Sequence, residues 1–441
     1  MQRFRDPLLF LISIAVLLSA AIYNGFPLLY SDTGTYIFSG FKFEMPVDRP
    51  ITYGLFIYIT SLGGLSLWLT IITQTALLSW LIKELIARFI PRDRVAKLHF
   101  IFCIALSVFT GISFVTSQLI PDIFTPILAL TLYLFLIRVN ETGKKRWWFL
   151  LLIFLSCAMH TSNVLIASGT VIVYLLAELR NRKNLSRRWK EFGVTLSAII
   201  LSSVFMFSSY AKSSHVFQLG RLAQSGTLQT YLSDSCKTHH YDICDCMDSI
   251  PHNADDVIWQ KNNHVLATAG GWKESKVQLS EIIHNIYFTP HYLWMQLKSD
   301  AADVGKQLIT FGSGEGLIDY QENIPVRQAL LEYFPSSVPR YLSSAQHAGR
   351  MEKPYYFNII SLLFMFLSFI VILYSILSRS GNKVILQLLI FTIMIYLLNC
   401  LVCASLVTVA NRFGCRLAWI FPLISLLLIT EMMLKRKQIG Q

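Results

Sequence analysis

Apolar segments alternate with short basic segments along most of the chain. Many of the apolar segments contain about twenty residues, the length that a helix needs to cross a bilayer. We therefore predict about ten membrane-spanning helices, at residues 8–24, 65–87, 98–116, 122–138, 147–160, 161–178, 192–210, 355–377, 383–406 and 414–433. The fifth and sixth are divided only by the polar group His160, Thr161, Ser162 and Asn163, where we expect a turn.

Two long connections interrupt this pattern. In the first, residues 25–64, the stretch ITYGLFIYITSLGG after Pro50 is apolar but too short to span, so we expect it along or partly within the membrane interface. The second, residues 211–354, contains helical-looking stretches broken by glycine and proline, which predicts a small, mostly helical domain. The expected fold is an all-α polytopic membrane protein in three parts: residues 1–210, 211–354 and 355–441.

Lysine and arginine gather in alternate connections between the predicted spans. By the positive-inside rule these connections and both chain ends lie in the cytoplasm, and residues 211–354 lie on the opposite side. The connections assigned to that opposite side at 117–121, 160–163 and 407–413 hold one cation, Arg412. The cytoplasmic cations are Arg3, Arg5, Lys83, Arg88, Arg92, Arg94, Lys97, Arg138, Lys144, Lys145, Arg146, Arg180, Arg182, Lys183, Arg187, Arg188, Lys190, Arg379, Lys383, Lys435, Arg436 and Lys437.

Composition and charge argue against a soluble globular protein and against a nucleic-acid-binding protein. With 54% hydrophobic and 15% charged residues and a mean hydropathy of +0.51, the chain has too much apolar surface for one soluble core. The net charge of +12 follows the membrane topology, since the cations sit in short clusters between apolar runs, and we expect no nucleic-acid partner.

Polar residues near the membrane gather on the non-cytoplasmic side. Each alone is explained by a helix cap or by contact with lipid headgroups, as for Asp122 after Pro121 or for Arg412. As a set they favour one polar cavity at that surface, because ionisable groups at a membrane boundary are costly unless they face water or one another. The set includes Asp32, Tyr36, Asp48, Arg49, Gln118, Asp122, His160, Thr161, Ser162, Asn163, Asn411, Arg412 and Arg416.

The order of these features resembles the GT-C class of membrane glycosyltransferases. The shared features are an aspartate in the first non-cytoplasmic loop (SDTGTY, with Asp32), the apolar stretch PITYGLFIYIT after it, seven spans to about residue 210, and a long loop thereafter. The resemblance covers most of the chain and implies a polyprenyl-phosphate-linked sugar donor. It implies transfer of a hexose or pentose to a glycolipid, polysaccharide or protein acceptor.

The chain departs from that class in two places. Asp32 is followed by Thr33 rather than by a second acidic residue, and the large loop has no WWD triplet, which argues against oligosaccharide transfer to asparagine. The cytoplasmic side shows no DxD motif of the kind that binds nucleotide sugars, which favours a donor that enters from the membrane.

For this chemistry Asp32 is the candidate catalytic base, because the acceptor hydroxyl must lose a proton as it attacks the sugar. Arg412 and Arg416, spaced i, i+4, are expected to hold the lipid phosphate, with Arg49 or His160 beside them. Further expected substrate-binding residues are Tyr36, Asp122, Asn163 and Glu315, the last in the glycine-rich stretch FGSGEGLIDY, which we interpret as a loop that closes over the cavity. No cofactor is certain; a divalent metal held by Asp32, Asp122 and His160 is an alternative.

The second long connection contains Cys236, Cys244 and Cys246. In an oxidising compartment one pair is expected to be bridged, and we predict Cys236 with Cys244. The interleaved residues His239, His240, Asp242 and Asp245 leave a zinc site as an alternative.

Two other functional classes are compatible with these features. One is a transporter or lipid flippase of a cell-envelope pathway, although no internal repeat is evident; the other is a non-enzymatic assembly protein. The expected location is a bacterial-type inner membrane, with the large loop in the periplasm, or its equivalent in the endoplasmic reticulum.

Overall fold

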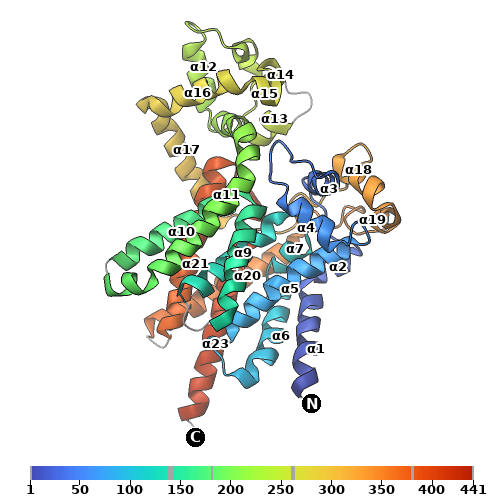
Figure 1. Cartoon of the computed structure of the whole chain (residues 1–441), viewed down its shortest axis with the longest axis vertical. Coiled ribbons are helices and arrows are strands. Elements are labelled where there is room, and N and C mark those ends of the chain that lie inside the picture. Colours follow the sequence, from blue (N-terminus) through green and yellow to red (C-terminus); the bar gives the residue numbers. More distant parts are fainter. Residues whose placement is uncertain (1, 138–142, 180–181, 260–263, 379–381, 440–441) are drawn as a thin grey trace.

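The computed structural model describes residues 2–137, 143–179, 182–259, 264–378 and 382–439. These residues form helices and connections without a β-strand, and the one isolated bridge joins Leu28 to Gln118. Both chain ends lie at one end of the molecule, opposite a helical head that contains α12 to α17 (Figure 1). The fold is therefore all-α, as the sequence predicted.

Six helical segments are long and apolar enough to cross a membrane. They coincide with six of the ten predicted spans. Two begin with a side-chain cap: Ser66 accepts from the Trp68 amide before α5, and Asn382 accepts from the Val384 amide before α21. The six are α5 (Leu67–Ile86), α10 (Thr161–Leu179), Arg188–Phe207 within α11, α20 (Tyr355–Leu377), α21 (Lys383–Leu406) and Asn411–Lys435, which contains α22 (Asn411–Ala418) and most of α23 (Ile420–Ile439).

The other four predicted spans are helical but shorter, broken or charged. The helix that covers the start of the first span holds Pro7 and ends at Leu17, and the helix that covers most of the third begins before it, with the charged turn Arg92–Lys97. That all ten cross the bilayer stays a prediction. These segments are α1 (Gln2–Leu17) with α2 (Ser19–Asn24), α6 (Arg92–Phe109) with α7 (Ile112–Ser117), the apolar run Pro121–Ile137 that contains α8 (Phe124–Leu132), and α9 (Arg146–Met159).

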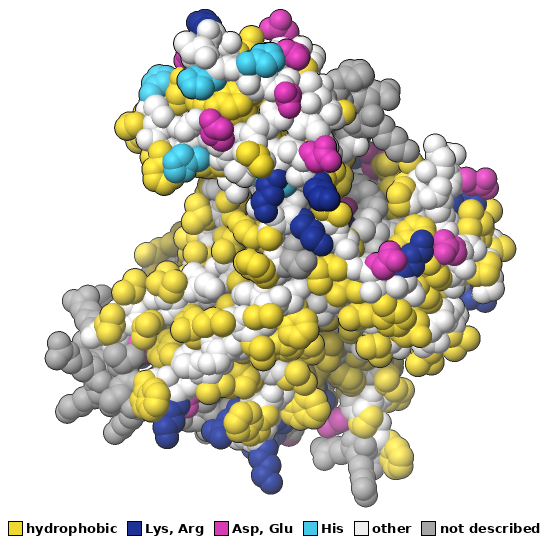
Figure 2. Space-filling view, turned by 45° about the horizontal axis from the view of Figure 1, so that its top comes forward, with side chains coloured by type: hydrophobic (Ala, Val, Ile, Leu, Met, Phe, Trp, Pro, Cys, Tyr) yellow, Lys and Arg dark blue, Asp and Glu magenta, His cyan; other side chains and the backbone are white. Residues whose placement is uncertain are grey.

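The outer surface of the candidate spans is hydrophobic. On α20, side chains such as Leu362, Phe366 and Leu373 are more than half exposed. Figure 2 shows hydrophobic side chains covering the body of the molecule, whereas charged and histidine side chains are prominent on the head. Exposed apolar area of this extent is unfavourable in water, so the body is suited to a lipid bilayer.

The head is built on a continuation of α11, which runs without a break from Arg182 to Gln224. Its own hydrophobic core includes Leu219, Leu232 and Ile282. Arg221 is buried and donates to the carboxylates of Asp300 and Asp303, at 2.6 and 2.7 Å. The head helices are α12 (Thr227–Ser235), α13 (Ala254–Trp259), α14 (His264–Thr268), α15 (Gly271–Glu274), α16 (Lys276–Phe288) and α17 (Pro290–Ile309).

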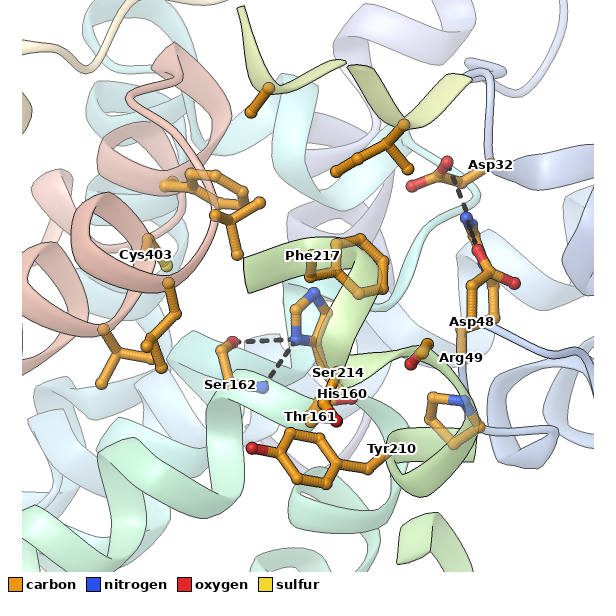
Figure 3. Close-up of a pocket in the computed structure, with 18 of the residues that line it drawn as sticks. Asp32, Asp48, Arg49, His160, Thr161, Ser162, Tyr210, Ser214, Phe217 and Cys403 are labelled. Atoms are coloured by element: carbon orange, nitrogen blue, oxygen red, sulfur yellow. Dashed lines mark hydrogen bonds and ion pairs between the residues drawn. The ribbon is translucent and has the colours of Figure 1, made fainter. Parts of the chain in front are cut away.

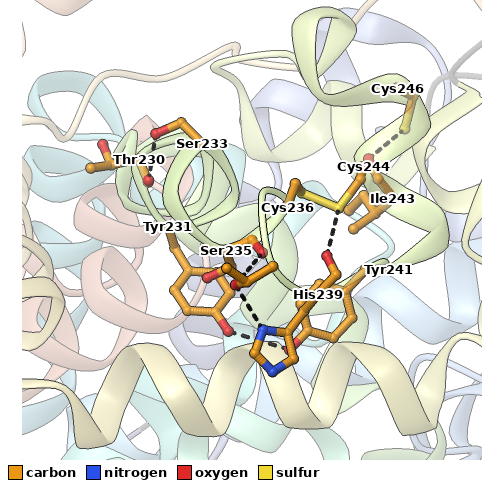
Figure 4. The surroundings of a disulfide bond; sticks show 11 residues. Thr230, Tyr231, Ser233, Ser235, Cys236, His239, Tyr241, Ile243, Cys244 and Cys246 are labelled. Atoms are coloured by element: carbon orange, nitrogen blue, oxygen red, sulfur yellow. Dashed lines mark hydrogen bonds between the residues drawn. A yellow bond between two sulfur atoms is a disulfide. The ribbon is translucent and has the colours of Figure 1, made fainter.

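The head contains the disulfide predicted from the sequence. Cys236 and Cys244 are bonded, and Cys246 is a free thiol next to them (Figure 4). His239 lies beside the bridge, and its backbone carbonyl faces the Cys244 sulfur. Among the described residues, no group of three or more histidine, cysteine, aspartate or glutamate side chains is arranged to hold a metal.

Residues 310–353 pack beside the first connection. Their helices are α18 (Pro325–Tyr333) and α19 (Val338–Leu342), and α18 packs on α3 (Thr33–Lys42), which in turn packs on α4 (Thr52–Thr60). Gln346 is fully buried; its amide donates to the Leu29 and Ile318 carbonyls and accepts from the Leu29 amide. The first connection is thereby fixed against a segment three hundred residues later.

Candidate functional site

A cavity of about 230 Å³ lies where the head meets the body. Helices α3, α10, α11, α13, α21 and α22 contribute to its wall, together with the connection that holds Asp48, Arg49 and Pro50. Figure 3 shows His160 near Phe217, with Asp32 and Arg49 on another side of the same space. Five predicted site residues line it: Asp32, Tyr36, Arg49, His160 and Arg412.

Asp32 lies between two arginines. Its Oδ1 is 3.0 Å from Arg49 Nη1, and its Oδ2 is 3.4 Å from Arg412 Nη1. Burial raises the pKa of Asp32, but the two guanidinium groups outweigh it and lower the pKa to about 2. The carboxylate is therefore ionised at neutral pH.

A local turn aims Asp32 at these partners. The Tyr30 amide donates to the Thr33 hydroxyl, which itself donates to the Leu119 carbonyl at 3.0 Å. Asp32 occupies the position before α3, where a carboxylate often caps the helix, but its side chain makes no capping hydrogen bond. The carboxylate is thus free to face the cavity.

Arg49 is held by Asp48 and by an aromatic ring. Its Nε donates to Asp48 Oδ2 at 2.7 Å, and its Nη2 contacts the same oxygen. Its guanidinium lies 5.2 Å from the centre of the Tyr36 ring. Nη1 makes the ion pair to Asp32 but has no hydrogen bond of good geometry, so it retains a donor for another acceptor.

Arg412 is fixed from behind by the glycine-rich segment. Glu315 accepts a hydrogen bond from the Arg412 backbone amide at 3.1 Å, and the guanidinium lies 4.6 Å from the centre of the Tyr30 ring. That ring packs so tightly on Gly316, at φ 72°, that a Cβ there would lie 2.1 Å from it. Glu315 therefore helps to position Arg412 through its backbone amide. The Glu315 side chain itself does not line the main cavity.

Arg416 and Asp122 form a buried pair behind Arg412. Arg416 is fully buried and donates to Asp122 Oδ1, while its Nη2 donates to Asn399 at 2.6 Å. Asp122 also lies 3.9 Å from Arg412 Nη1. Both residues were predicted to bind substrate, but the structure places them outside the wall of the main cavity.

His160 interrupts the helices on either side of it. It is extended, at φ −147° and ψ 128°, between the end of α9 and the start of α10, so the expected turn consists of this one residue. The Ser162 amide donates to its Nδ1 at 3.2 Å, so a neutral His160 carries its proton on Nε2. That nitrogen is 3.9 Å from Asp122 Oδ1.

Asn163 does not reach the cavity. It is fully buried, accepts from the Thr125 hydroxyl and donates to the Ser156 carbonyl, both at 2.8 Å. Its amide thus joins α8, α9 and α10, which is a structural role.

The proposed metal ligands do not form a suitable set. Arg412 contacts both Asp32 and Asp122, and the second carboxylate is also bound by Arg416. Guanidinium groups already satisfy these oxygens, so the arrangement does not fit a divalent cation.

Sequence reasoning missed the apolar wall of the cavity. Its side chains include Leu165, Phe217, Ile258, Trp259 and Leu406. We ended the seventh span at residue 210, although no proline or glycine follows until Gly220. That absence of helix breakers was the available signal that α11 continues and brings Phe217 to the cavity.

The cavity therefore joins two chemistries. One part is charged, with the guanidinium groups of Arg49 and Arg412 and the carboxylates of Asp32, Asp48 and Asp255; the other is an apolar wall that includes Leu165 and Leu406, each 43% exposed. Searches against protein-family models, curated proteins and solved structures find no match to this chain.

Proposed function

We propose that this protein is a glycosyltransferase that moves a sugar from a polyprenyl-phosphate donor to a glycan, lipid or protein acceptor on the non-cytoplasmic side of a bacterial-type inner membrane. The observation that carries the proposal is Asp32, ion-paired to Arg49 and Arg412, in a cavity whose opposite wall is apolar. A phosphate with a long isoprenoid chain has the matching two-part chemistry.

The proposed topology has ten spans in a GT-C-like arrangement, with both ends in the cytoplasm. Its support is the basic character of the connections assigned to the cytoplasm, together with the position of both chain ends opposite the head (Figure 1).

In the proposed reaction, Asp32 accepts the proton of the acceptor hydroxyl as that oxygen attacks the anomeric carbon. The bond from that carbon to the phosphate oxygen breaks, and its electron pair leaves with the polyprenyl phosphate. Arg49 and Arg412 stabilise the phosphate, because a guanidinium fork matches two of its oxygens.

The same arginines set the basicity of Asp32. With both paired to it, the pKa of Asp32 is about 2, which makes it a weak base. A bound phosphate competes for these donors, so the carboxylate loses its partners and its proton affinity rises. Donor binding and activation of the base are thereby coupled.

The test uses purified full-length protein in lipid nanodiscs and a panel of undecaprenyl-phosphate donors that carry glucose, galactose, mannose or arabinose. Release of undecaprenyl phosphate is measured with and without membrane extract as acceptor. We expect turnover of at least one donor, loss of turnover in Asp32→Asn, and normal turnover in Asp93→Asn, which alters an exposed carboxylate. Unchanged turnover in Asp32→Asn, or none by the wild type with any donor, overturns the proposal and favours transport or assembly.

A further inference from the structure

A second recess, of about 440 Å³, lies among residues 319–347. It shares no lining residue with the Asp32 cavity. Its wall consists of Asp319, Tyr320, Gln321, Glu322, Asn323, Arg327, Leu342 and His347. Nothing in the reaction outlined above uses these residues.

Arg327 is unusual among the buried cations of the described residues. Only 4% of it is exposed, its Nε is buried without a hydrogen-bond partner, and no described carboxylate lies within 4.0 Å of its guanidinium. By contrast, Arg221 and Arg416 are both paired with carboxylates. A guanidinium that no described carboxylate neutralises and that lines a recess is available to an anion, which points to an anion-binding role for Arg327.

The position of Arg327 is well defined. Its guanidinium lies 5.3 Å from the centre of the Tyr341 ring, and the residue belongs to the first turn of α18. Its charge is therefore held at the wall of the recess by packing and not by an ion pair.

The acidic residues of the recess do not neutralise Arg327. Asp319 already accepts from His347 Nδ1 and Gln321 Nε2, each at 2.7 Å, and from the Tyr341 hydroxyl at 3.3 Å. Glu322 is exposed at the surface. Together with the amides of Gln321 and Asn323, the exposed carboxylate of Glu322 offers hydrogen bonds that suit sugar hydroxyls.

The recess is close to the proposed catalytic base. A Cβ on Gly34, two residues after Asp32, would lie 2.4 Å from the Pro325 carbonyl carbon, so α3 directly contacts the start of α18. Burial raises the pKa of Tyr320, which lines the recess, and the negative charge of Asp32 raises it further. The recess therefore adjoins the helix that follows Asp32 but lies outside the donor cavity.

We propose that this recess binds an anionic saccharide, with Arg327 holding its carboxylate or phosphate, and that it receives part of the acceptor. The acceptor role rests on the proposed glycosyl transfer, whereas the binding site itself does not.

Binding is tested by saturation-transfer NMR on the purified full-length protein in detergent. The probes are glucuronate and glucose 6-phosphate, with glucuronamide and glucose as their uncharged counterparts. We expect each anion to bind at least tenfold more tightly than its neutral counterpart, and the tighter of the two anions identifies carboxylate or phosphate as the group recognised. Arg327→Gln should remove this preference, while Arg340→Gln, which alters an exposed arginine on the adjacent α19, should keep it.

Equal binding of charged and neutral probes overturns the proposal, and this comparison needs no variant, so a misfolded Arg327→Gln cannot hide the answer. Unchanged preference in an Arg327→Gln protein that melts like the wild type also overturns it. The Asp32→Asn variant should bind the probes normally. Loss of turnover without loss of binding therefore separates a failure of the transfer reaction from a failure of the recess.

Discussion

Arg412 follows Asp32 by 380 residues, yet its Nη1 lies 3.4 Å from Asp32 Oδ2. The same nitrogen is 3.9 Å from Asp122 Oδ2. One cation near the end of the chain thus faces carboxylates from the first connection and from the start of Pro121–Ile137. The candidate site is complete only when the C-terminal helices pack against the N-terminal part of the chain.

Arg412→Gln is expected to lower donor turnover by about 10²-fold, because a guanidinium that stabilises the departing phosphate is lost. Arg412→Lys should recover only part of the rate, since an ammonium keeps the charge without the fork. Steady-state turnover in nanodiscs measures both, with Arg340→Gln as the control. Wild-type rates in Arg412→Gln would exclude Arg412 from the phosphate site.

The Asp32 pairs predict a specific pH dependence. The pKa of Asp32 lies below its usual 3.8, at about 2, so its contribution to folding is complete above pH 4 and is lost as the pH falls toward 2. With about 1.4 kcal/mol per pKa unit, the contribution is about 2 kcal/mol. Melting curves in detergent between pH 5 and 2.5 should show wild type and Asp32→Asn converging as the pH falls. A constant difference between them would show that Asp32 is not held ionised.

The Asp122–Arg416 pair is expected to act on stability more than on chemistry. Arg416→Met alone leaves a buried carboxylate with only the more distant Arg412 and His160, and Asp122→Asn alone leaves a buried guanidinium; each should cost about 3–5 kcal/mol. The double variant Asp122→Asn, Arg416→Met should be less destabilised than the sum of the two. A double-mutant cycle on melting temperature measures this coupling. If the stability loss of the double variant equals the sum of the two single losses, Asp122 and Arg416 do not form a direct ion pair.

Apolar segments of about twenty residues predicted an all-α fold with ten spans, and the structure contains helices long and apolar enough to cross a membrane at six of them. The break at His160 was visible because four polar residues interrupt an apolar run. The sequence alone did not show which of the polar residues line the cavity. Asn163 belongs to the same polar group as His160, but the first turn of α10 directs its side chain into the packing of α8 and α9.

The spacing of Arg412 and Arg416 did not reveal that the two residues have different roles. Arg412 and Arg416 lie four residues apart on one helix, which predicts a shared direction. In the structure Arg412 faces the cavity, whereas Arg416 is buried against Asn399 and Asp122. Likewise, only three-dimensional contacts reveal that Arg327 Nε is buried without a hydrogen-bond partner.

Phe217→Ala tests the apolar wall. Phe217 packs edge-on against Trp259 and Trp272, and it lines the cavity. If the wall holds an isoprenoid chain, the variant should raise KM for an undecaprenyl donor several-fold and leave KM for a short citronellyl donor unchanged. Phe288→Ala, which removes a side chain that is 76% exposed, is the control. An equal change for both donors would place the lipid chain elsewhere.

Gly34→Ala tests whether α3 and α18 position both the carboxylate and the recess. The added Cβ would lie 2.4 and 2.5 Å from backbone atoms of Pro325 and Val326, which no rotamer change relieves. We expect a loss of about 1–3 kcal/mol in stability, as for overpacked cores, and lower turnover, because Asp32 lies two residues away. Gly305→Ala is the matched control: it lies in α17 with nothing within 4 Å of the added atom, and higher helix propensity should leave stability unchanged or slightly raised. Melting temperature and turnover are measured for both variants. A Gly34→Ala protein as stable and active as Gly305→Ala would show that the contact between α3 and α18 accommodates the added methyl group without displacing Asp32.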